Sequence, residues 1–520
     1  MKQLLNVLCV ILVALPFLVS AQNNPCGTDF DLQMEERLKR NIQAIKDANF
    51  SRSGMTTYVP VRIHIVGTVA GNGQEKVGKY SVFQMLCKLN NVYAPQDIQF
   101  YLSGSNMNEF DNDVVYNHSN VNGARTQMAI RKVNNAINIF MCGNLVTSGS
   151  TVGTILGYYS PTIDVLAMRN AEANPNSMTL SHEAGHFFSL AHPHNGWEGT
   201  PYHNYDGNGS SYGPSNLPPS FIGGGSGIAV ELADGSNCAN AGDFVCDTPP
   251  DYNFGFTNGN GCTYNGNGVD PTGAPVSPDE TNIMSYFSDN CVNSFSATQE
   301  NIVAADLQSV TRNYLTNNPP TSTVAISGTP TLVAPANQGM PANFDNVTLN
   351  WDDYTDASGY LVQVALTASF TNATMVYEDI VNSSSVTLTN LDPNRTYFWR
   401  VMAFNEVSLC NGFSANRRFT TNDWPTAVQD IQGLEEITLR PNIASSGQSV
   451  ILEVGTNKSF EAAVTVYNIA GQVVKNIQSI PFQSGVTNYE LETGDLTPGV
   501  YIVNVLAETG MVSRKLVITK

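Results

Sequence analysis

The chain has 520 residues, which is too long for one compact core, and a typical size of about 150 residues per domain predicts three or four units. Hydrophobic residues make up 42% of the chain, as in ordinary globular proteins, and this argues against wholesale disorder. The formal net charge of −19 argues against nucleic acid and against an anionic membrane surface as partners, because both require clustered lysines and arginines.

Residues 1–21 have the pattern of a secretory signal peptide. Lys2 gives the positive start, LLNVLCVILVALPFLV is the apolar run, and Val19-Ser20-Ala21 is a small-residue cleavage site. The apolar run is slightly short for a membrane span, and no other stretch reaches 18 apolar residues. We therefore expect a secreted protein without a membrane span.

Secretion favours disulfide bonds, which persist in oxidising compartments. After Cys9 in the signal, the cysteines are Cys26, Cys87, Cys142, Cys238, Cys246, Cys262, Cys291 and Cys410. Four of them fall between 238 and 291 and predict two bridges across a long irregular region. The individual partners stay open at this point.

Residues 22–55 are charged and favour a helix, and an alternating run at 61–66 predicts the first strand. A mixed α/β region then continues as far as the linker-like run TNNPPTSTV at 316–324. Within it, residues 195–251 are rich in Gly, Asn, Ser and Pro. This composition predicts a long loop that is held by disulfides or ions.

A histidine cluster stands out in this region. The chain has seven histidines, and five of them lie within 22 residues: His182, His186, His192, His194 and His203. His182 and His186 are four residues apart, which places both imidazoles on one face of a helix. Glu183 lies beside that face. In this H-E-x-x-H pattern the two imidazoles bind zinc and the glutamate serves as base.

His192 follows His186 by six residues, so the chain must turn sharply to bring a third imidazole to the metal. That spacing resembles the extended zinc motif of the metzincins, which has glycine where this chain has Ser189. A serine with positive φ costs about 1 kcal/mol, which a zinc site contributing about 10 kcal/mol outweighs. If the turn does not form, His194 or His203 is the alternative third ligand.

Two further motifs follow the zinc motif, GDFVCDTPPD at 242–251 and TNIMSYFSDNC at 281–291. Together the three motifs closely resemble the pappalysin-type metzincins, the cytophagalysin-like secreted metallopeptidases, over about residues 56–317. The resemblance implies protein or peptide substrates and zinc as cofactor. It also implies that Met284 forms the methionine turn beneath the metal and that Tyr286 stabilises the reaction intermediate.

Cys26, in NPCGTDF, resembles the latency element of some zymogens in this family, in which a pro-segment cysteine takes the fourth zinc position. This resemblance implies a pro-segment at 22–55 that is removed by cleavage within 46–58, with Arg52-Ser53 as a candidate bond. The alternative for Cys26 is an ordinary disulfide. If Cys410 is unpaired, six cysteines remain to pair without Cys26, and this parity favours the free thiol.

Acidic residues in the long loop give a second metal candidate. They are Asp234, Asp243, Asp247 and Asp251. Oxygen-rich loops bind calcium, and members of the resembled family often do so, but the spacing matches no EF-hand. Solvated loop acids are the default interpretation, with calcium as the alternative.

After the linker, VTLNWDDYTDASGYLVQVAL and TYFWRVMAFN alternate as strands of a β-sandwich. Trp351 and the strand at 397–400 make residues 325–421 resemble a fibronectin type III domain. LRPN, YNIAGQVV, LTPGVYIV and RKLVITK make residues 433–520 resemble the C-terminal sorting domain of type IX secretion cargo. That resemblance implies the type IX machinery as partner and a location outside, or on the surface of, a Gram-negative bacterium; another adhesive sandwich is the alternative.

The expected fold is multidomain, an α/β metzincin catalytic domain followed by two all-β sandwich domains. The expected function is a secreted zinc endopeptidase in which Glu183 is the general base. The alternative is a catalytically inactive surface adhesion or binding protein on the same scaffold. The complete set of His182, Glu183, His186 and His192 favours the enzyme, because a degenerate site would have lost one member.

Overall fold

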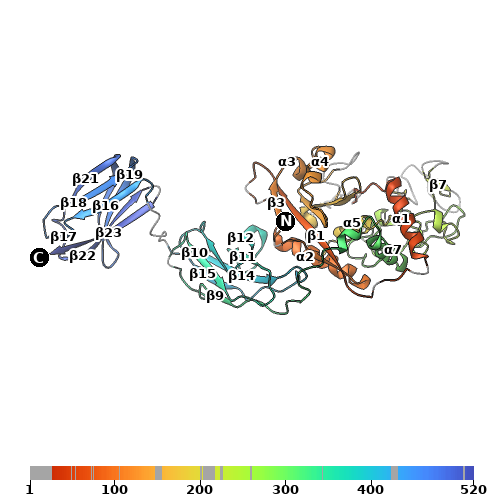
Figure 1. Cartoon of the computed structure of the whole chain (residues 1–520). Coiled ribbons are helices and arrows are strands. Elements are labelled where there is room, and N and C mark those ends of the chain that lie inside the picture. Colours follow the sequence, from red (N-terminus) through yellow and green to blue (C-terminus); the bar gives the residue numbers. More distant parts are fainter. Residues whose placement is uncertain are drawn as a thin grey trace, which may run out of the picture.

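The protein is multidomain and rich in β-structure, with an α/β unit followed by two units made of strands (Figure 1). The computed structural model describes residues 26–520 apart from 48–49, 53, 72, 74, 105, 147–154, 199–201, 203–216, 223–226, 258–260, 342, 423–430 and 508–509. The signal peptide expected at 1–21 and the alternative ligand His203 lie outside the described residues.

A six-stranded sheet forms the centre of the α/β unit. Its strands are β1 (Thr57–Gly67), β2 (Ile98–Leu102), β3 (Asn108–Asp111), β4 (Ile137–Cys142), β5 (Gly157–Ser160) and β6 (Val165–Arg169). The order is β2-β1-β4-β6-β5, with β3 also paired to β1, and β5 alone runs antiparallel to its neighbour. All six residues of β4 are buried, as expected for a strand covered on both faces. The edge strand β5 lies next to the helix that carries the histidines.

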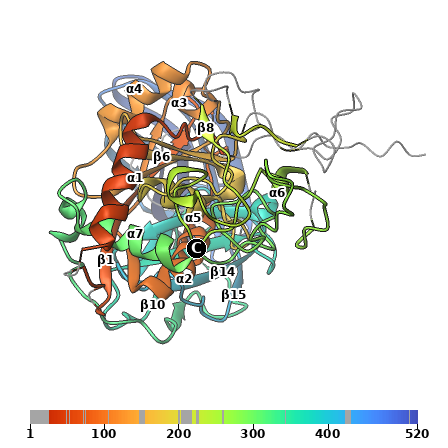
Figure 2. The ribbon, with the colours of Figure 1, turned by 90° about the vertical axis from the view of Figure 1, so that its right-hand side faces the viewer.

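Seven α-helices occur in the described part of the chain. They are α1 (Leu32–Ile45), α2 (Lys79–Tyr93), α3 (Asp113–Asn117), α4 (Val121–Arg131), α5 (Thr179–Phe187), α6 (Phe254–Thr257) and α7 (Ala297–Gln308). The helix expected within 22–55 is α1, and it packs along α7 (Figures 1 and 2). Every residue of α5 is buried, because α5 packs against α2 and against strands β5 and β6.

The chain between α5 and α7 is mostly irregular where it is described, with α6 and two short strands, β7 (Phe221–Ile222) and β8 (Ile228–Ala229). Two disulfides, Cys238–Cys246 and Cys262–Cys291, pin this region. The two bridges predicted for the cysteines between 238 and 291 are therefore confirmed.

The middle unit is the expected β-sandwich, with three strands in one sheet (β13-β10-β9) and four in the other (β12-β11-β14-β15). The bounds are β9 (Leu332–Ala334), β10 (Val347–Trp351), β11 (Gly359–Ala365), β12 (Met375–Val381), β13 (Ser385–Leu388), β14 (Thr396–Phe404) and β15 (Arg417–Thr420). Trp351 and Trp399 are buried in its core, which agrees with the periodicity of the sequence.

The expectation that Cys410 is unpaired is wrong. Cys410 is bonded to Cys87 on α2, with the two Cα atoms 5.6 Å apart, and Cys142 is a buried free thiol together with Cys26. The reason is a packing contact that the sequence does not show: the sandwich lies against α2. The rings of Phe83 and Phe404, for example, are 5.0 Å apart across this junction.

The last unit has two sheets, β16-β18-β21 and β17-β23-β22-β19-β20, around a core of its own. Its strands are β16 (Leu434–Arg440), β17 (Ile443–Ser445), β18 (Val450–Thr456), β19 (Phe460–Asn468), β20 (Val473–Phe482), β21 (Gly485–Leu491), β22 (Gly499–Ala507) and β23 (Gly510–Thr519). Among the described residues, no helix combines the length and the apolar character that crossing a membrane requires.

Candidate metal centre and active site

The zinc-motif helix ends in a tight turn that places the third histidine. The Leu190 amide donates to the Gly185 carbonyl at 2.9 Å and the Ser189 amide donates to the His186 carbonyl at 2.9 Å. These two bonds form a Schellman motif, in which the residue after the helix takes left-handed geometry. Ser189 has φ 71°, so the strain expected from a serine at this position is present. The chain then reverses and reaches His192.

Three imidazoles converge at one point. The Nε2 atom of His192 lies 3.1 Å from that of His182 and 3.0 Å from that of His186. Each Nδ1 atom faces an oxygen acceptor at 2.8–2.9 Å: the Ile283 carbonyl, the Leu190 carbonyl and the Glu198 carboxylate. The Nδ1 atoms therefore carry the protons, and all three Nε2 atoms present lone pairs to one another.

This arrangement fits a cation better than it fits the protein alone. Burial and the neighbouring His192 lower the pKa of His182 to about 3, and burial drives the pKa of His186 well below its ordinary value. Three neutral Nε2 atoms cannot hydrogen-bond to one another. Tetrahedral zinc with Zn–N distances of about 2.0 Å places its nitrogens about 3.3 Å apart, close to the observed separations. The donor set therefore suits zinc.

Glu183 lies beside the three nitrogens with one oxygen held and one free. Its Oε2 accepts hydrogen bonds from the Thr28 hydroxyl at 2.8 Å and from the Tyr159 amide at 3.1 Å. Its Oε1 is buried and has no partner among the described residues. Burial raises the pKa of Glu183 to about 7, and hydrogen bonds from Thr28, Cys26 and the Tyr159 amide oppose this rise. A carboxyl group with such a pKa can take and return a proton at neutral pH.

Cys26 is brought to the same point from the beginning of the described chain. Its Sγ atom lies 3.4 Å from His186 Nε2 and 3.6 Å from Glu183 Oε2. The ligand atoms of Cys26, His182, His186 and His192 are all within 4.8 Å of one another. A tetrahedral zinc site with one sulfur and three nitrogens has S–N distances of about 3.5 Å, so the thiol occupies the position of a fourth ligand.

The segment that carries Cys26 also contacts the edge strand. Cys26 pairs in parallel with Gly157 of β5, and the Gly27 amide donates to the Gly157 carbonyl at 2.9 Å. Thr28 accepts a hydrogen bond from the Tyr159 amide at 2.8 Å while donating to Glu183. The Cys-Gly-Thr stretch thus covers the fourth ligand position, the glutamate and the open edge of the sheet together.

Met284 and Tyr286 both lie at the centre. Met284 is fully buried beneath α5, and its Sδ atom is 2.3 Å from the point where a Cβ atom on Gly185 would lie. The ring centroid of Tyr286 is 4.9 Å from that of His192 and 5.9 Å from that of His182. The Tyr286 hydroxyl is buried next to Cys26.

A cavity of 230 Å³ opens beside Glu183 and His182. Its walls are mainly apolar, with Met178, Phe256, Ile283, Phe287 and Val292, and its polar lining includes Ser285, Ser288 and Asp289. A mainly apolar cavity with a few polar groups, beginning at His182 and Glu183, has the character of a site for a small ligand or a side chain.

The structure does not bring His194 to the three Nε2 atoms as a ligand. Its ring stacks on His192 with centroids 4.6 Å apart, and its Nδ1 atom lies 3.9 Å from Asp251 Oδ2. Among the described residues, neither of its buried nitrogens has a hydrogen-bond partner. The four loop aspartates do not converge either. Asp234 and Asp247 are exposed, and Asp251 Oδ1 accepts a hydrogen bond from the Phe254 amide at 2.9 Å.

Asp243 is instead buried close to Glu231, a residue that the sequence reasoning did not single out. Burial raises the pKa of Asp243 to about 8, and burial together with Asp243 raises the pKa of Glu231 to about 9.

Two further residues of the site were not predicted from the sequence: Glu198, which orients His192, and Thr28, which donates a hydrogen bond to Glu183. Thr28 lies within the Cys-Gly-Thr stretch, so its proximity to Cys26 was the available signal. No specific feature of the sequence pointed to Glu198.

Comparison with known proteins identifies the end of the chain. Residues 444–519 match the family described as "Secretion system C-terminal sorting domain". This match supports the type IX secretion machinery as a partner and a secreted or cell-surface location. The last β unit is therefore a sorting domain, as its motifs predicted.

Two further similarities are limited in extent. A Kelch domain-containing protein of Saccharolobus solfataricus is 27% identical over 136 residues, which is 26% of this chain and only 17% of that protein. The crystal structure of the chicken CNTN1 FN1–FN3 domains matches with 12% identity and a TM-score of 0.17, over 38% of this chain and 69% of that chain.

Proposed function

We propose that this protein is a secreted zinc-dependent endopeptidase of the pappalysin-type metzincin class, with its active site in the α/β unit. One observation carries the proposal: the Nε2 atom of His192 lies 3.0–3.1 Å from those of His182 and His186, beside a buried glutamate with a free oxygen among the described residues. A helix that carried these residues for stability alone would gain nothing from three opposed lone pairs. The sorting domain supports an extracellular setting.

The residues of this chain have distinct roles in the proposed reaction. When held by His182, His186 and His192, zinc would supply Lewis acidity to a water molecule and to a peptide carbonyl. Glu183 would accept the proton of the attacking water at Oε1 and pass it to the nitrogen of the departing amine. The Tyr286 hydroxyl would donate a hydrogen bond to the oxyanion that develops.

Substrate binding follows from the position of β5. Within the sheet this strand pairs only with β6, and Cys26 and Gly27 contact its outer edge. Once the pro-segment is removed, that edge would offer main-chain groups to an extended peptide. A peptide on this edge would lie close to Glu183, because the Tyr159 amide of the same strand donates to Glu183 Oε2 at 3.1 Å. The adjacent 230 Å³ cavity would receive one side chain of that peptide.

The same geometry supports latency. Cys26 takes the place of the fourth ligand, Thr28 occupies Glu183 Oε2, and the backbone between them covers the edge of β5. Burial and the charge of Glu183 raise the pKa of the Cys26 thiol well above its ordinary value, an effect that a cation at the three histidines would oppose. Residues 22–55 would then act as a pro-segment that must be cut within 46–58.

Calcium remains part of the proposal at a second position. The buried carboxyl groups of Asp243 and Glu231, with the Thr248 hydroxyl 2.9 Å from both Asp243 oxygens, form an oxygen-rich set. A hard cation there would stabilise both groups in their charged forms. Thermal unfolding with and without calcium, for the natural chain and for Asp243→Asn, tests this site.

The decisive experiment uses the chain after removal of the pro-segment and a diverse peptide library. We expect cleavage that disappears in Glu183→Ala and in a zinc chelator, while Glu183→Ala still contains zinc by elemental analysis. Glu198→Gln is the matched control, because it keeps the catalytic glutamate and weakens only the orientation of His192. Metal loss in Glu183→Ala would contradict the assigned roles.

The alternative function is an inactive adhesion or binding protein. It predicts bound zinc but no cleavage of any peptide by the processed chain. In that case the surfaces of the sandwich, rather than the cavity beside Glu183, would be the place to search for a ligand.

A further inference from the structure

Helix α1 contacts the turn of the zinc motif at a distance from the metal. It is amphipathic, with Met34, Leu38 and Asn41 buried and 2%, 0% and 4% exposed. Arg37 and Asn41 are four residues apart, so both extend from the buried side of the helix. Figure 2 shows α1 next to α7 and α5. The helix therefore presents two polar groups to the support of the active site.

Both side chains make specific hydrogen bonds. Arg37 Nε donates to Asp306 Oδ1 at 2.7 Å, and Arg37 Nη2 donates to Asp306 Oδ2 and to the Phe187 carbonyl, the latter at 2.6 Å. Asn41 Nδ2 donates to Asp306 Oδ1 at 2.7 Å and to the Ser189 hydroxyl at 2.8 Å. Phe187 ends the zinc-motif helix, and the side chain of Asp306 on α7 is fully buried.

These contacts explain the serine in the zinc motif. The position has φ 71°, where glycine would be free of strain. A glycine, however, would leave one hydrogen bond of Asn41 unmade. Ser189 is fully buried, and its hydroxyl accepts a hydrogen bond from the side-chain amide of Asn41. Ser189 thus has a small conformational cost from its positive φ, and it gains a hydrogen bond with α1.

We propose that the Phe187 carbonyl, Ser189 and Asp306 form an anchor for an amphipathic helix with Arg and Asn four residues apart, and that α1 is its own ligand. This inference rests on the proposed function, because it takes residues 22–55 as the pro-segment. It goes further in separating inhibition into two contacts. Cys26 binds at the metal, whereas α1 binds the anchor without zinc.

The buried charge makes the anchor selective for its ligand. Without α1, the nearest remaining cation to Asp306 is Arg312, whose Nε lies 3.7 Å from Oδ2. A fully buried carboxylate that loses the bidentate contact of Arg37 is strongly driven to recover it. After cleavage, α1 therefore stays on the enzyme, and its slow departure sets the rate of activation.

The test uses the full chain with a site-specific protease sequence inserted after Gly54. Nothing lies within 4 Å of a Cβ atom at Gly54, and Met55 is 73% exposed, so the insertion disturbs little. The chain is labelled on the N-terminal fragment, kept in chelator to remove the zinc link, and cut. The rate at which the fragment leaves is then measured by fluorescence anisotropy.

We expect slow release from the natural sequence even in chelator. Arg37→Ala should speed release on the order of a hundredfold, because a buried charge-assisted contact is lost. Arg40→Ala is the matched control on the same helix, since the Arg40 side chain is 62% exposed, and it should leave the rate unchanged. Arg37→Lys keeps the charge without the forked geometry and should give an intermediate rate.

A double-mutant cycle isolates the serine. Ser189→Gly should speed release about fivefold in the natural sequence and have no effect in Asn41→Ala, because both variants remove the same hydrogen bond. Immediate release in chelator, equal rates for Arg37→Ala and Arg40→Ala, or an unchanged effect of Ser189→Gly in Asn41→Ala would each overturn the proposal. Thermal unfolding of the uncut variants checks that each of them folds. If Arg37→Ala does not fold, the release rate of Arg37→Lys tests whether Arg37 holds the fragment. A protein that binds the fragment as expected but cuts no peptide would refute the proposed function alone.

Discussion

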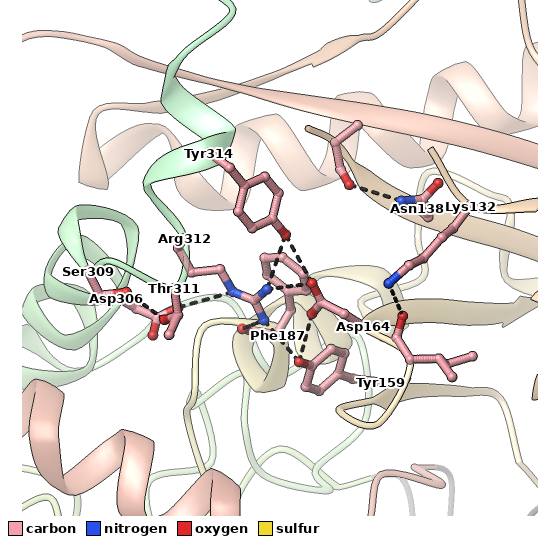
Figure 3. Close-up of polar contacts among 12 residues, drawn as sticks. Lys132, Asn138, Tyr159, Asp164, Phe187, Asp306, Ser309, Thr311, Arg312 and Tyr314 are labelled. Atoms are coloured by element: carbon pink, nitrogen blue, oxygen red, sulfur yellow. Dashed lines mark hydrogen bonds and ion pairs between the residues drawn. The ribbon is translucent and has the colours of Figure 1, made fainter. Parts of the chain in front are cut away.

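Arg312 fastens the end of the zinc-motif helix to the sheet, and its loss is the most informative stability test. Its guanidinium donates to Asp164 at 2.7 Å, to the Tyr159 hydroxyl at 2.9 Å and to the Phe187 carbonyl at 3.2 Å (Figure 3). It also lies 3.7 Å from the centre of the Phe187 ring and 3.7 Å from the buried carboxylate of Asp306. One side chain therefore joins α5, β5 and α7.

The expected magnitude follows from burial. The side chain of Arg312 is 4% exposed, and those of Asp164 and Asp306 are 28% and 0% exposed. Replacing Arg312 by methionine keeps most of the volume and removes the charge, which leaves the fully buried Asp306 and the partly buried Asp164 without this partner. Breaking such a pair costs about 3–5 kcal/mol. The matched control is Arg395→Met, whose partner Asp392 is 63% exposed and whose loss should cost less than about 1 kcal/mol.

The penalty should depend on pH through Asp164. Burial alone would raise the pKa of Asp164, but Arg312 and the hydroxyls of Tyr159 and Tyr314 hold this pKa below its ordinary value. A carboxyl group with a lowered pKa in the folded state stabilises the fold above its unfolded pKa, and this contribution is lost as the pH falls through the folded pKa. The cost of Arg312→Met should therefore be full at neutral pH and shrink below about pH 4.

Hydrogen exchange read by mass spectrometry measures this effect locally, which suits a multidomain chain that does not unfold in one step. The chain is kept in chelator to prevent self-cleavage. Peptides from 157–192 should lose about 3–5 kcal/mol of opening free energy in Arg312→Met, while peptides of the sorting domain stay unchanged. A loss no larger than that of Arg395→Met, or one that is the same at pH 7 and at pH 3.5, would refute the reasoning.

Three further predictions concern the metal centre and its support. Tyr286→Phe should lower kcat about a hundredfold with KM and zinc content unchanged, which steady-state kinetics and elemental analysis check; zinc loss would contradict the role in the reaction. Gly185→Ala should destabilise the site by about 1–3 kcal/mol, because its Cβ would lie 2.3 Å from Met284 Sδ, while Gly494→Ala, with open space around it, should unfold at the natural temperature. Cys410→Ser should lower the opening free energy of α2 and of the sandwich by about 2–5 kcal/mol in the same hydrogen-exchange experiment, and it should leave the sandwich docked. An increase in the radius of gyration by X-ray scattering would show that the docking contact is weaker than expected.

The sequence predicted the local part of the site well. Two histidines four residues apart must share a helix face, and that inference needs no knowledge of the rest of the fold. The step to His192 was harder, because it depended on whether Ser189 could adopt positive φ. The structure shows that it does, with two main-chain bonds of the turn and the Asn41 contact to hold it. The strain was predictable, but the contact that balances it was not.

Contacts between distant segments explain what the sequence did not reveal. Cys87 and Cys410 are separated by 323 residues, and their pairing depends on the packing of the sandwich against α2. Counting the cysteines therefore predicted correctly that Cys26 is a free thiol, but for a wrong reason, because it assumed that Cys410 is unpaired. Likewise, Arg37 and Asp306 are far apart in the sequence, and neither belongs to a motif that would connect them.

The position of the sandwich bears on the choice between enzyme and adhesion protein. A binding module that acts independently of its neighbour needs a mobile connection to that neighbour. In this protein the sandwich has a core of its own, but Leu361, Met402 and Phe404 belong instead to the apolar core that also includes residues of α2 and α5. The ion pair of Lys79 with Asp379 and a disulfide reinforce the junction. The sandwich therefore supports α2, the helix behind the zinc motif. Such support favours the enzyme, because an active site needs fixed geometry, whereas an adhesion module on a tether does not.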